Sequence, residues 1–221
     1  MSKKKKHQTF YNILDSRELN TATSKIAANI RFKDLSAPVK LIAISSPTKN
    51  EGKTTVAVSL AGCFADSGLR TLLIDTDIHQ HSISHMFRKD NRFSVYDVFS
   101  GICSLEGAIY STNRQNLYFL DCVKSISSIP ELVGTVEFTN MLNVLKNNFD
   151  RIIFDTPPVL PCIDGTMISA VCDGAIIVVK QYKTKKEEVV RLKEQMDIAH
   201  VNILGSVINF SDKSEYKYYD Y

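Results

Sequence analysis

The sequence predicts an α/β fold in which a mainly parallel, doubly wound sheet is flanked by helices. Short apolar runs bounded by turn formers recur along the 221-residue chain, and such runs are typical of strands buried on both faces of a parallel sheet. Segments with apolar residues at helical spacing separate them, and this alternation favours an α/β architecture. The composition, 44% hydrophobic and 23% charged, is that of a soluble globular domain rather than a disordered chain.

The first predicted strand, residues 41–45, leads into a loop with the features of a phosphate-binding loop. Residues 46–52 read SPTKNEG, and from Lys53 onward apolar positions recur at helical spacing. In a strand, loop and helix that opens at Gly-Lys-Thr, backbone N–H groups and the positive helix end bind phosphate oxygens. The pattern therefore predicts a P-loop NTPase that binds ATP, with Lys53 at the β- and γ-phosphates and Thr54 on Mg²⁺. The expected cofactor-binding residues of this stretch are Thr48, Asn50, Glu51, Gly52, Lys53, Thr54 and Thr55.

Two further predicted strands end in carboxylates. The run TLLIDTD ends with Asp75 and Asp77, and the run RIIFD ends with Asp155. Ligands of an open parallel sheet lie outside the carboxyl ends of its strands, and Mg²⁺ takes few carboxylates because it keeps several waters. We therefore expect carboxylates at these strand ends to reach the γ-phosphate and the Mg²⁺ that Thr54 holds. For each aspartate taken singly, a helix cap or turn former is the alternative.

The rest of the chain divides into regular elements and two polar ends. Residues 1–20 are expected to form a mobile arm, residues 21–210 a single domain, and residues 211–221 a tail. Asn209 follows the last strand, where its amide is placed to bond an adenine edge. The charged helix at 183–199 is expected to turn Val189, Leu192, Met196 and Ala199 inward. The other expected strands are 117–120, 175–179 and 203–208, and the other expected helices are 21–35, 53–66, 94–99, 105–110 and 130–145.

Charge and hydropathy limit where the chain can act. The net charge of +3 does not indicate a nucleic-acid partner. No apolar run approaches the roughly 20 residues that cross a bilayer, and the N-terminus lacks the apolar segment of a signal peptide. We therefore expect a cytoplasmic protein. The basic cluster of Lys3 to Lys6 suits either an acidic membrane surface or a solvated arm.

The tail is rich in tyrosine. It reads SDKSEYKYYDY, and four of the nine tyrosines of the chain fall in its last six positions. A polar terminal segment after the last strand is not expected to pack in the core, so these side chains are candidate phosphoacceptors that would each gain roughly −1.5 to −2 charge. A merely adhesive tail is the alternative. The candidates are Tyr216, Tyr218, Tyr219 and Tyr221.

Together these features resemble the bacterial tyrosine kinases of polysaccharide export. The resemblance runs from about Ile26 to the terminus and is carried by the GKTT loop, LLIDTD, FDTPPV with Asp164 beyond it, GSVIN at 205–209, and the tail. It implies a protein-tyrosine autokinase that uses ATP and Mg²⁺. It further implies Lys53, Asp75 and Asp77 as catalytic residues, with Asp75 the base for the incoming hydroxyl. The metal ligands that the resemblance implies are Thr54, Asp77 and Asp155.

The resemblance also implies partners. The chain is similar to the split form of the family, in which the cytoplasmic tail of a separate membrane protein activates the kinase at the inner face of the membrane. Family rings place one subunit's tail in its neighbour's site, so a homo-oligomer is implied. A cognate tyrosine phosphatase and a role in capsule or exopolysaccharide synthesis are implied as well.

The chain departs from the family pattern at three places. His79, Gln80 and His81 stand where the family has Arg, Lys and Pro, and Pro47 stands in the phosphate loop where the general pattern has Gly. Thr21, Ser24 and Ala27 stand where family members carry a Glu and two Arg for ring contacts.

Two other functions remain open. One is a partition or cell-division ATPase that uses hydrolysis as a dimerisation switch, although that class places a second Lys where this chain has Thr48. The other is a regulatory scaffold that binds nucleotide and presents the tail to partners.

Overall fold

The computed structural model describes residues 10–77, 83, 93–122 and 129–211. Within them, a seven-stranded sheet runs in the order β3-β4-β2-β5-β1-β6-β7. All neighbouring strands are parallel except β3 and β4, which are antiparallel. The strands are β1 Leu41–Ser45, β2 Thr71–Asp75, β3 Ile109–Ser111, β4 Leu117–Asp121, β5 Arg151–Asp155, β6 Gly174–Lys180 and β7 Ile203–Asn209. The predicted mainly parallel α/β sheet is confirmed.

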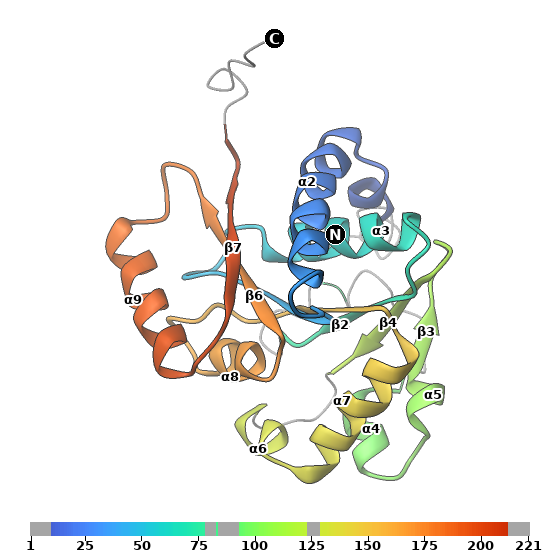
Figure 1. Cartoon of the computed structure of the whole chain (residues 1–221). Helices are drawn as coiled ribbons and strands as arrows, with labels where there is room; N and C mark the ends of the chain where they lie inside the picture. The colour runs from blue at the N-terminus through green and yellow to red at the C-terminus, as the bar shows by residue number, and fades with distance from the viewer. Residues whose placement is uncertain (1–9, 78–82, 84–92, 123–128, 212–221) are drawn as a thin grey trace, which may run out of the picture.

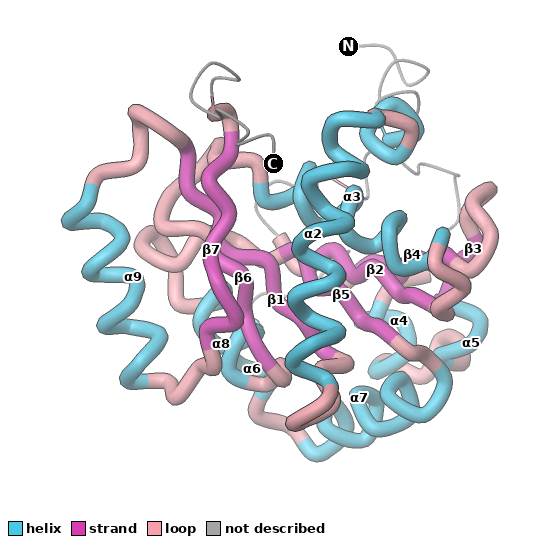
Figure 2. The backbone as a smooth tube through the Cα atoms, turned by 45° about the horizontal axis from the view of Figure 1, so that its top comes forward, coloured by secondary structure: helices cyan, strands magenta, loops and turns pink. Residues whose placement is uncertain are grey.

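Helices cover both faces of this sheet (Figure 1). Helices α2 and α3 pack on one face, and the others lie on the opposite face or around it, with α9 beside the β6–β7 edge and β3 at the far edge (Figure 2). The helices are α2 Arg17–Asp34, α3 Lys53–Asp66, α4 Val95–Phe99, α5 Leu105–Ala108, α6 Ile129–Val133, α7 Val136–Asn148, α8 Asp164–Ala170 and α9 Lys186–Ile198.

The central strand β1 shows why the sheet is buried on both sides. Ile42 and Ile44 belong to the core shared with α2 and α3. Leu41 joins the core around α7, and Ala43 the core that contains α9. Because successive side chains of a strand point to opposite faces, an uninterrupted apolar run serves two helical layers at once.

The N-terminal segment is more ordered than the sequence predicts. Residues 10–14 form a helical turn, and α2 begins at Arg17 rather than residue 21, with the Ser16 hydroxyl accepting the Leu19 N–H. Phe10 and Leu14 are fully buried in the core beside α3. The expected mobile arm is therefore wrong for residues 10–20, because two apolar residues four positions apart share one helical face. Residues 1–9 lie outside the described part.

Other differences are local. The helix expected at 105–110 ends at Ala108, and the chain continues as the antiparallel strand β3. The helix expected at 130–145 is two helices, because Thr135 caps the start of α7. Helix α8 is absent from the prediction. Helix α9 begins at Lys186 and buries Leu192 and Met196 as expected, whereas Val189, expected to face inward, is 36% exposed.

Candidate functional site

The predicted phosphate loop and two of the predicted carboxylates meet at one edge of the sheet. Strand β1 lies between β5 and β6, and β5 lies next to β2. The register pairs Asp155 with Ile44 on one side and with Asp75 on the other. The carboxyl ends of β1, β2 and β5 therefore bring the start of the loop and both aspartates to one level, which is where an open parallel sheet binds its ligands.

The loop between β1 and α3 is held in a defined shape. Gly52 has φ +94° and Asn50 has φ +63°, both in the left-handed region, which Gly and Asn adopt most readily. The Ser46 hydroxyl donates to the Thr48 carbonyl at 2.6 Å. The carbonyls of Ser46 and Pro47 accept hydrogen bonds from the backbone N–H groups of residues 159 and 160. Pro47 is thus accommodated, and the backbone after β5 fixes the entry to the loop.

Helix α3 starts in a way that leaves its first N–H groups available to an anion. Its N-cap is Gly52, no side chain within the described residues caps it, and its first turn carries no acidic residue. Lys53, the first residue of the helix, is only 6% exposed. Unpaired N–H groups, the helix dipole and a buried ammonium group together favour phosphate. The arrangement is that of a nucleotide-binding loop.

Replacing Gly52 by Ala is expected to weaken nucleotide binding at least ~10-fold, because a tight backbone approach to phosphate tolerates no displacement. A Cβ on Gly52 would lie 2.0 Å from Nδ2 of Asn209, and the positive φ alone costs about 1–2 kcal/mol. Gly68→Ala is the matched control, since Gly68 also has a positive φ, of +83°, but a Cβ added there would have no atom within 4 Å. ADP titration and thermal melting separate the two: both variants lose stability, and unchanged ADP affinity in Gly52→Ala would contradict the assignment.

The carboxylates differ in how the chain satisfies them. Asp75 is fully buried and accepts backbone N–H groups from Asp77 at 3.2 Å and Ile83 at 3.0 Å. Asp155 is 1% exposed, and neither of its carboxylate oxygens has a hydrogen-bond partner among the described residues. Burial, and then the charge of Asp75, raise the pKa of Asp155 well above its usual range, while the nearby Lys53 opposes the shift.

The unsatisfied Asp155 fits a divalent cation. Buried charges are ordinarily paired or bound to metal, and the groups that act on Asp155 include Asp75, Asp77 and the Thr54 hydroxyl. No group of three or more His, Cys, Asp or Glu side chains within the described residues forms a complete protein metal cage. Mg²⁺ takes only one or two carboxylates and fills its octahedron with waters and phosphate oxygens, so the buried Asp155 carboxylate has the chemistry that one such ligand would need.

Asn209 reaches the loop, as its position at the end of β7 suggests. Its Nδ2 donates to the backbone carbonyl of Glu51 at 3.0 Å, and its Oδ1 accepts the N–H of Phe210 at 2.9 Å. The Glu51 side chain, predicted with the nucleotide-binding set, is 1% exposed and bonded to Thr48 and Thr184. Glu51 therefore belongs to the loop through its backbone, and its carboxylate is engaged by the chain.

Known proteins resemble this chain over most of its length. The sequence model of the AAA domain family matches residues 39–206. The tyrosine-protein kinase YwqD of Bacillus subtilis strain 168 is 31% identical over 197 residues, which cover 88% of this chain and 83% of the relative. The tyrosine-protein kinase CpsD of Streptococcus agalactiae is 33% identical over 197 residues, which cover 89% and 85% of the two chains.

The chain belongs to the tyrosine-protein kinase family. The resemblance stated from the sequence motifs is thereby confirmed. Among solved structures, the chimerical protein CapA2B2 has a TM-score of 0.79 and 29% identity, covering 86% of this chain and 84% of its own.

Two more distant structures share the fold alone. The kinase domain of the Escherichia coli tyrosine kinase ETK has a TM-score of 0.81 at 22% identity and covers 91% and 79% of the two chains. The septum site-determining protein MinD of Pyrococcus horikoshii, complexed with Mg-ADP, has a TM-score of 0.62 at 24% identity and covers 76% and 69%. This tyrosine-kinase-family chain thus has the architecture of kinase domains and, more distantly, of MinD ATPases.

The sequence analysis did not predict one further aspartate at the same edge of the sheet. Asp121 ends β4, pairs in register with Asp75 and is 9% exposed. The signal was present, since the run LYFLD ends in Asp as the runs of β2 and β5 do. The four tail tyrosines, and His79 to His81 after the second acidic motif, lie outside the described residues. No helix among the described residues has the length and apolar character needed to traverse a bilayer.

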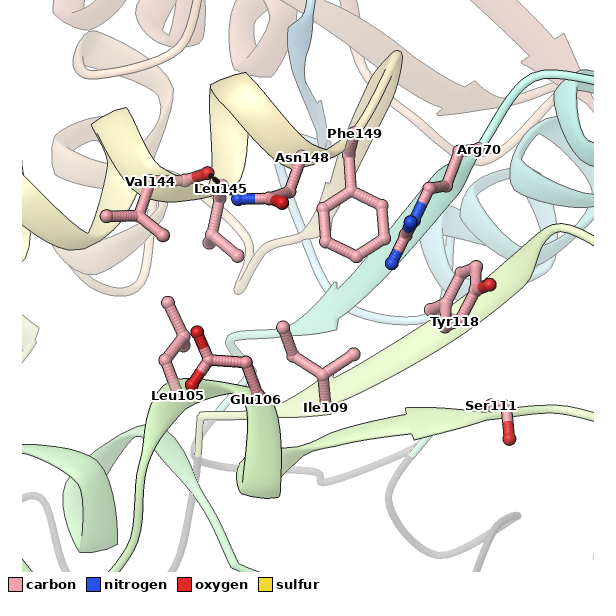
Figure 3. A pocket seen from close by; sticks show the side chains of 10 residues that line it. All are labelled: Arg70, Leu105, Glu106, Ile109, Ser111, Tyr118, Val144, Leu145, Asn148 and Phe149. Carbon is pink, nitrogen blue, oxygen red and sulfur yellow. Dashed lines mark hydrogen bonds between the residues drawn. The ribbon is translucent and has the colours of Figure 1, made fainter.

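A separate cavity of about 280 Å³ lies away from this site, between α7, α5 and the strands β3 and β4 (Figure 3). The Arg70 guanidinium lies 5.0 Å from the ring centroid of Tyr118 and 5.1 Å from that of Phe149. Arg70 precedes β2 and Phe149 precedes β5, so this cation–π stack stands at the amino ends of the strands. The stack therefore lies at the edge of the sheet opposite to the phosphate loop, and none of its three residues belongs to that loop.

Proposed function

We propose that this chain is an ATP-dependent protein-tyrosine autokinase that phosphorylates its own tail. The observation that carries the proposal is the phosphate loop beside two buried aspartates, in a chain of the tyrosine-protein kinase family whose last six residues hold four tyrosines. The phosphoacceptors are Tyr216, Tyr218, Tyr219 and Tyr221.

ATP binding rests on the loop and the start of α3. Backbone N–H groups from Asn50 to Thr55 surround the phosphates, with Thr48 at the start of the loop and the Lys53 ammonium at the β- and γ-phosphates. Asn209 contacts the loop through one hydrogen of its Nδ2 group, and in our proposal the second hydrogen of that group meets the adenine edge. Mg²⁺ bound by Thr54, Asp77 and Asp155 would neutralise the charge of the phosphate oxygens.

Phosphoryl transfer requires a base for the tyrosine hydroxyl, and Asp75 suits that role. The two backbone N–H groups that it accepts fix its orientation and leave further lone pairs on each oxygen. The phenolic oxygen forms a bond to the γ-phosphorus while the bond from that phosphorus to the β–γ bridging oxygen breaks. Asp75 takes the phenolic proton, and ADP leaves with the bridging oxygen. Lys53 stabilises the charge that gathers on the transferred group.

The partners follow from how relatives are built. The tyrosine-protein kinase ptk of Acinetobacter johnsonii is 29% identical over 217 residues, which are 98% of this chain but 30% of the relative. In our proposal a separate membrane activator takes the place of the remainder of such a longer protein. The cytoplasmic tail of this activator holds the cytoplasmic chain at the inner face of the membrane. A homo-oligomer with each tail in a neighbour's site, a cognate phosphatase and control of capsule or exopolysaccharide synthesis complete the proposal. Nucleic acid is not among the proposed partners.

Intact-mass spectrometry after incubation with Mg²⁺-ATP tests the function. The expected result is a series of mass steps of one phosphate each, absent from a variant with all four tail tyrosines changed to Phe. Tyr96→Phe is the matched control, because Tyr96 is 38% exposed but lies outside the tail, and it should keep every step.

The activator is the second arm of this experiment. A candidate membrane activator's cytoplasmic tail is added when the chain alone gives no step. No step under either condition, together with ATP hydrolysis, would establish a switch ATPase of the MinD kind instead. No step and no hydrolysis, with nucleotide bound, would establish a scaffold.

A further inference from the structure

The buried carboxylate of Glu51 lies at the centre of a partly buried hydrogen-bond cluster in the phosphate loop. Its Oε1 accepts the Thr48 hydroxyl at 3.0 Å and the Thr184 hydroxyl at 2.6 Å, and its Oε2 accepts the Thr48 N–H at 3.2 Å. Thr184 in turn accepts the Lys180 N–H at 2.8 Å. Thr184 lies between β6 and α9, far from the loop in sequence. The cluster therefore joins two segments that the sheet brings together at its carboxyl edge.

A second contact reaches the same residue from β7. The backbone carbonyl of Glu51 accepts Asn209 Nδ2 at 3.0 Å, directly before Gly52 takes its left-handed φ of +94°. Glu51 is thus held by its side chain to the β6–α9 connection and by its backbone to the end of β7. We call Glu51, Thr48, Thr184 and Asn209 the Glu51 clamp.

The burial of the Glu51 carboxylate restricts the shape of the phosphate loop. Burying a carboxylate is unfavourable without hydrogen bonds that replace its water, and Glu51 is 1% exposed. Its three side-chain hydrogen bonds compensate that cost only in one loop conformation, because two of them come from Thr48 at the other end of the same turn. The carboxylate therefore favours the loop shape in which Gly52, with its left-handed φ, opens helix α3.

We propose that Glu51 is a positioning residue that preorganises the phosphate loop for nucleotide through Thr184. It acts on nucleotide through the loop backbone, not by touching the phosphates. The proposal rests on the proposed function for its kinetic readout, but nucleotide affinity alone also tests it. A loop held in its binding shape pays less ordering entropy when ligand arrives, so loss of the clamp raises the KM for ATP more than it lowers kcat.

The test is a double-mutant cycle on Glu51→Ala and Thr184→Val, read as the KM for ATP, kcat and the Kd for Mg²⁺-ADP. We expect KM and Kd to rise ~10-fold in Glu51→Ala and ~3-fold in Thr184→Val, with the double variant no worse than Glu51→Ala, because residues in one hydrogen-bond cluster are not additive. Thr184→Ser keeps the hydroxyl and should restore wild-type affinity. Glu187→Ala, an exposed charge at the start of α9, is the matched control.

The outcomes separate the clamp from a general loss of structure and from the proposed function. A fall in kcat at unchanged KM and Kd would mean a smaller folded fraction and would overturn the proposal, as would fully additive effects. If Glu51→Ala fails to fold, the ADP affinities of Thr184→Val and Thr184→Ser decide: weaker binding in the Val variant alone supports the clamp, and equal binding in both overturns it. If the chain transfers no phosphate but the two substitutions have non-additive effects on the Kd for Mg²⁺-ADP, the kinase proposal is refuted and the clamp is supported. If the chain phosphorylates its tail but the two substitutions have additive effects on that Kd, the kinase proposal is supported and the clamp is refuted.

Discussion

Lys53→Met abolishes tail phosphorylation while leaving the fold intact: this is the largest effect that we expect of a single substitution. Lys53 is 6% exposed at the first position of α3, and its ammonium is close enough to Asp155 to oppose the rise in that carboxyl's pKa. A preorganised charge in such a site is worth ~10²–10³ in rate or more when it faces developing phosphate charge. Met keeps the unbranched shape of the stem, so packing should survive.

The measurement is the rate of phosphate incorporation by intact mass, alongside thermal melting and ADP titration. Lys33→Met is the matched control, because Lys33 is exposed in the last turn of α2 and should keep the wild-type rate. Phosphorylation at the wild-type rate with normal ATP affinity in Lys53→Met would remove Lys53 from the site.

Asp155→Asn is expected to lower the phosphorylation rate while raising the stability of the nucleotide-free protein. Both oxygens of Asp155 lack hydrogen-bond partners among the described residues, and burial raises the pKa of this carboxyl. Without metal the folded state must therefore bury an unsatisfied charge or take up a proton, and either is a cost to its stability. An amide of the same shape removes that charge. The free energy of unfolding of the nucleotide-free protein should rise by about 1 kcal/mol, or about 2–4 °C in melting temperature. The phosphorylation rate should fall ~10²-fold or more, because the metal loses its carboxylate ligand.

Asp75→Asn is the comparison that makes this result informative. Asp75 accepts two backbone N–H groups, and an amide can accept only with its single oxygen, so one buried donor loses its partner. That variant should lose activity and also about 1–3 kcal/mol of stability. Melting curves without nucleotide and phosphorylation assays with Mg²⁺ decide the matter. Equal destabilisation by both substitutions, or Mg²⁺-dependent activity retained in Asp155→Asn, would refute the metal-ligand role.

The parts of the site that the sequence predicts are those with strong local signals. A buried run followed by turn residues and Gly-Lys-Thr identifies the loop and α3, and Asp75 and Asp155 follow because each ends an apolar run. Parallel neighbours carry their carboxyl ends to one edge, so the register between these aspartates needs no further information.

What the sequence does not predict depends on contacts between distant segments. The bond from Thr184 to Glu51 joins residues that only the completed sheet brings together. Phe10 reads as part of a polar arm because its burial is created by α3. Strand β3 is three residues long and exists through its pairing with β4, since such a short segment has no periodicity of its own.

The central place of β1 also determines when the protein can first act. The phosphate loop leaves the ribosome well before the strands on either side of β1, which begin at Arg151 and Gly174. Pairing between strands so far apart in the chain waits for both to be synthesised, and it is slower than local folding. Thr184, whose hydroxyl donates to the Glu51 carboxylate in the loop, is translated later still. A nascent chain therefore carries the nucleotide motif long before it has a nucleotide site, and ATP turnover can begin only when translation of the domain is almost finished.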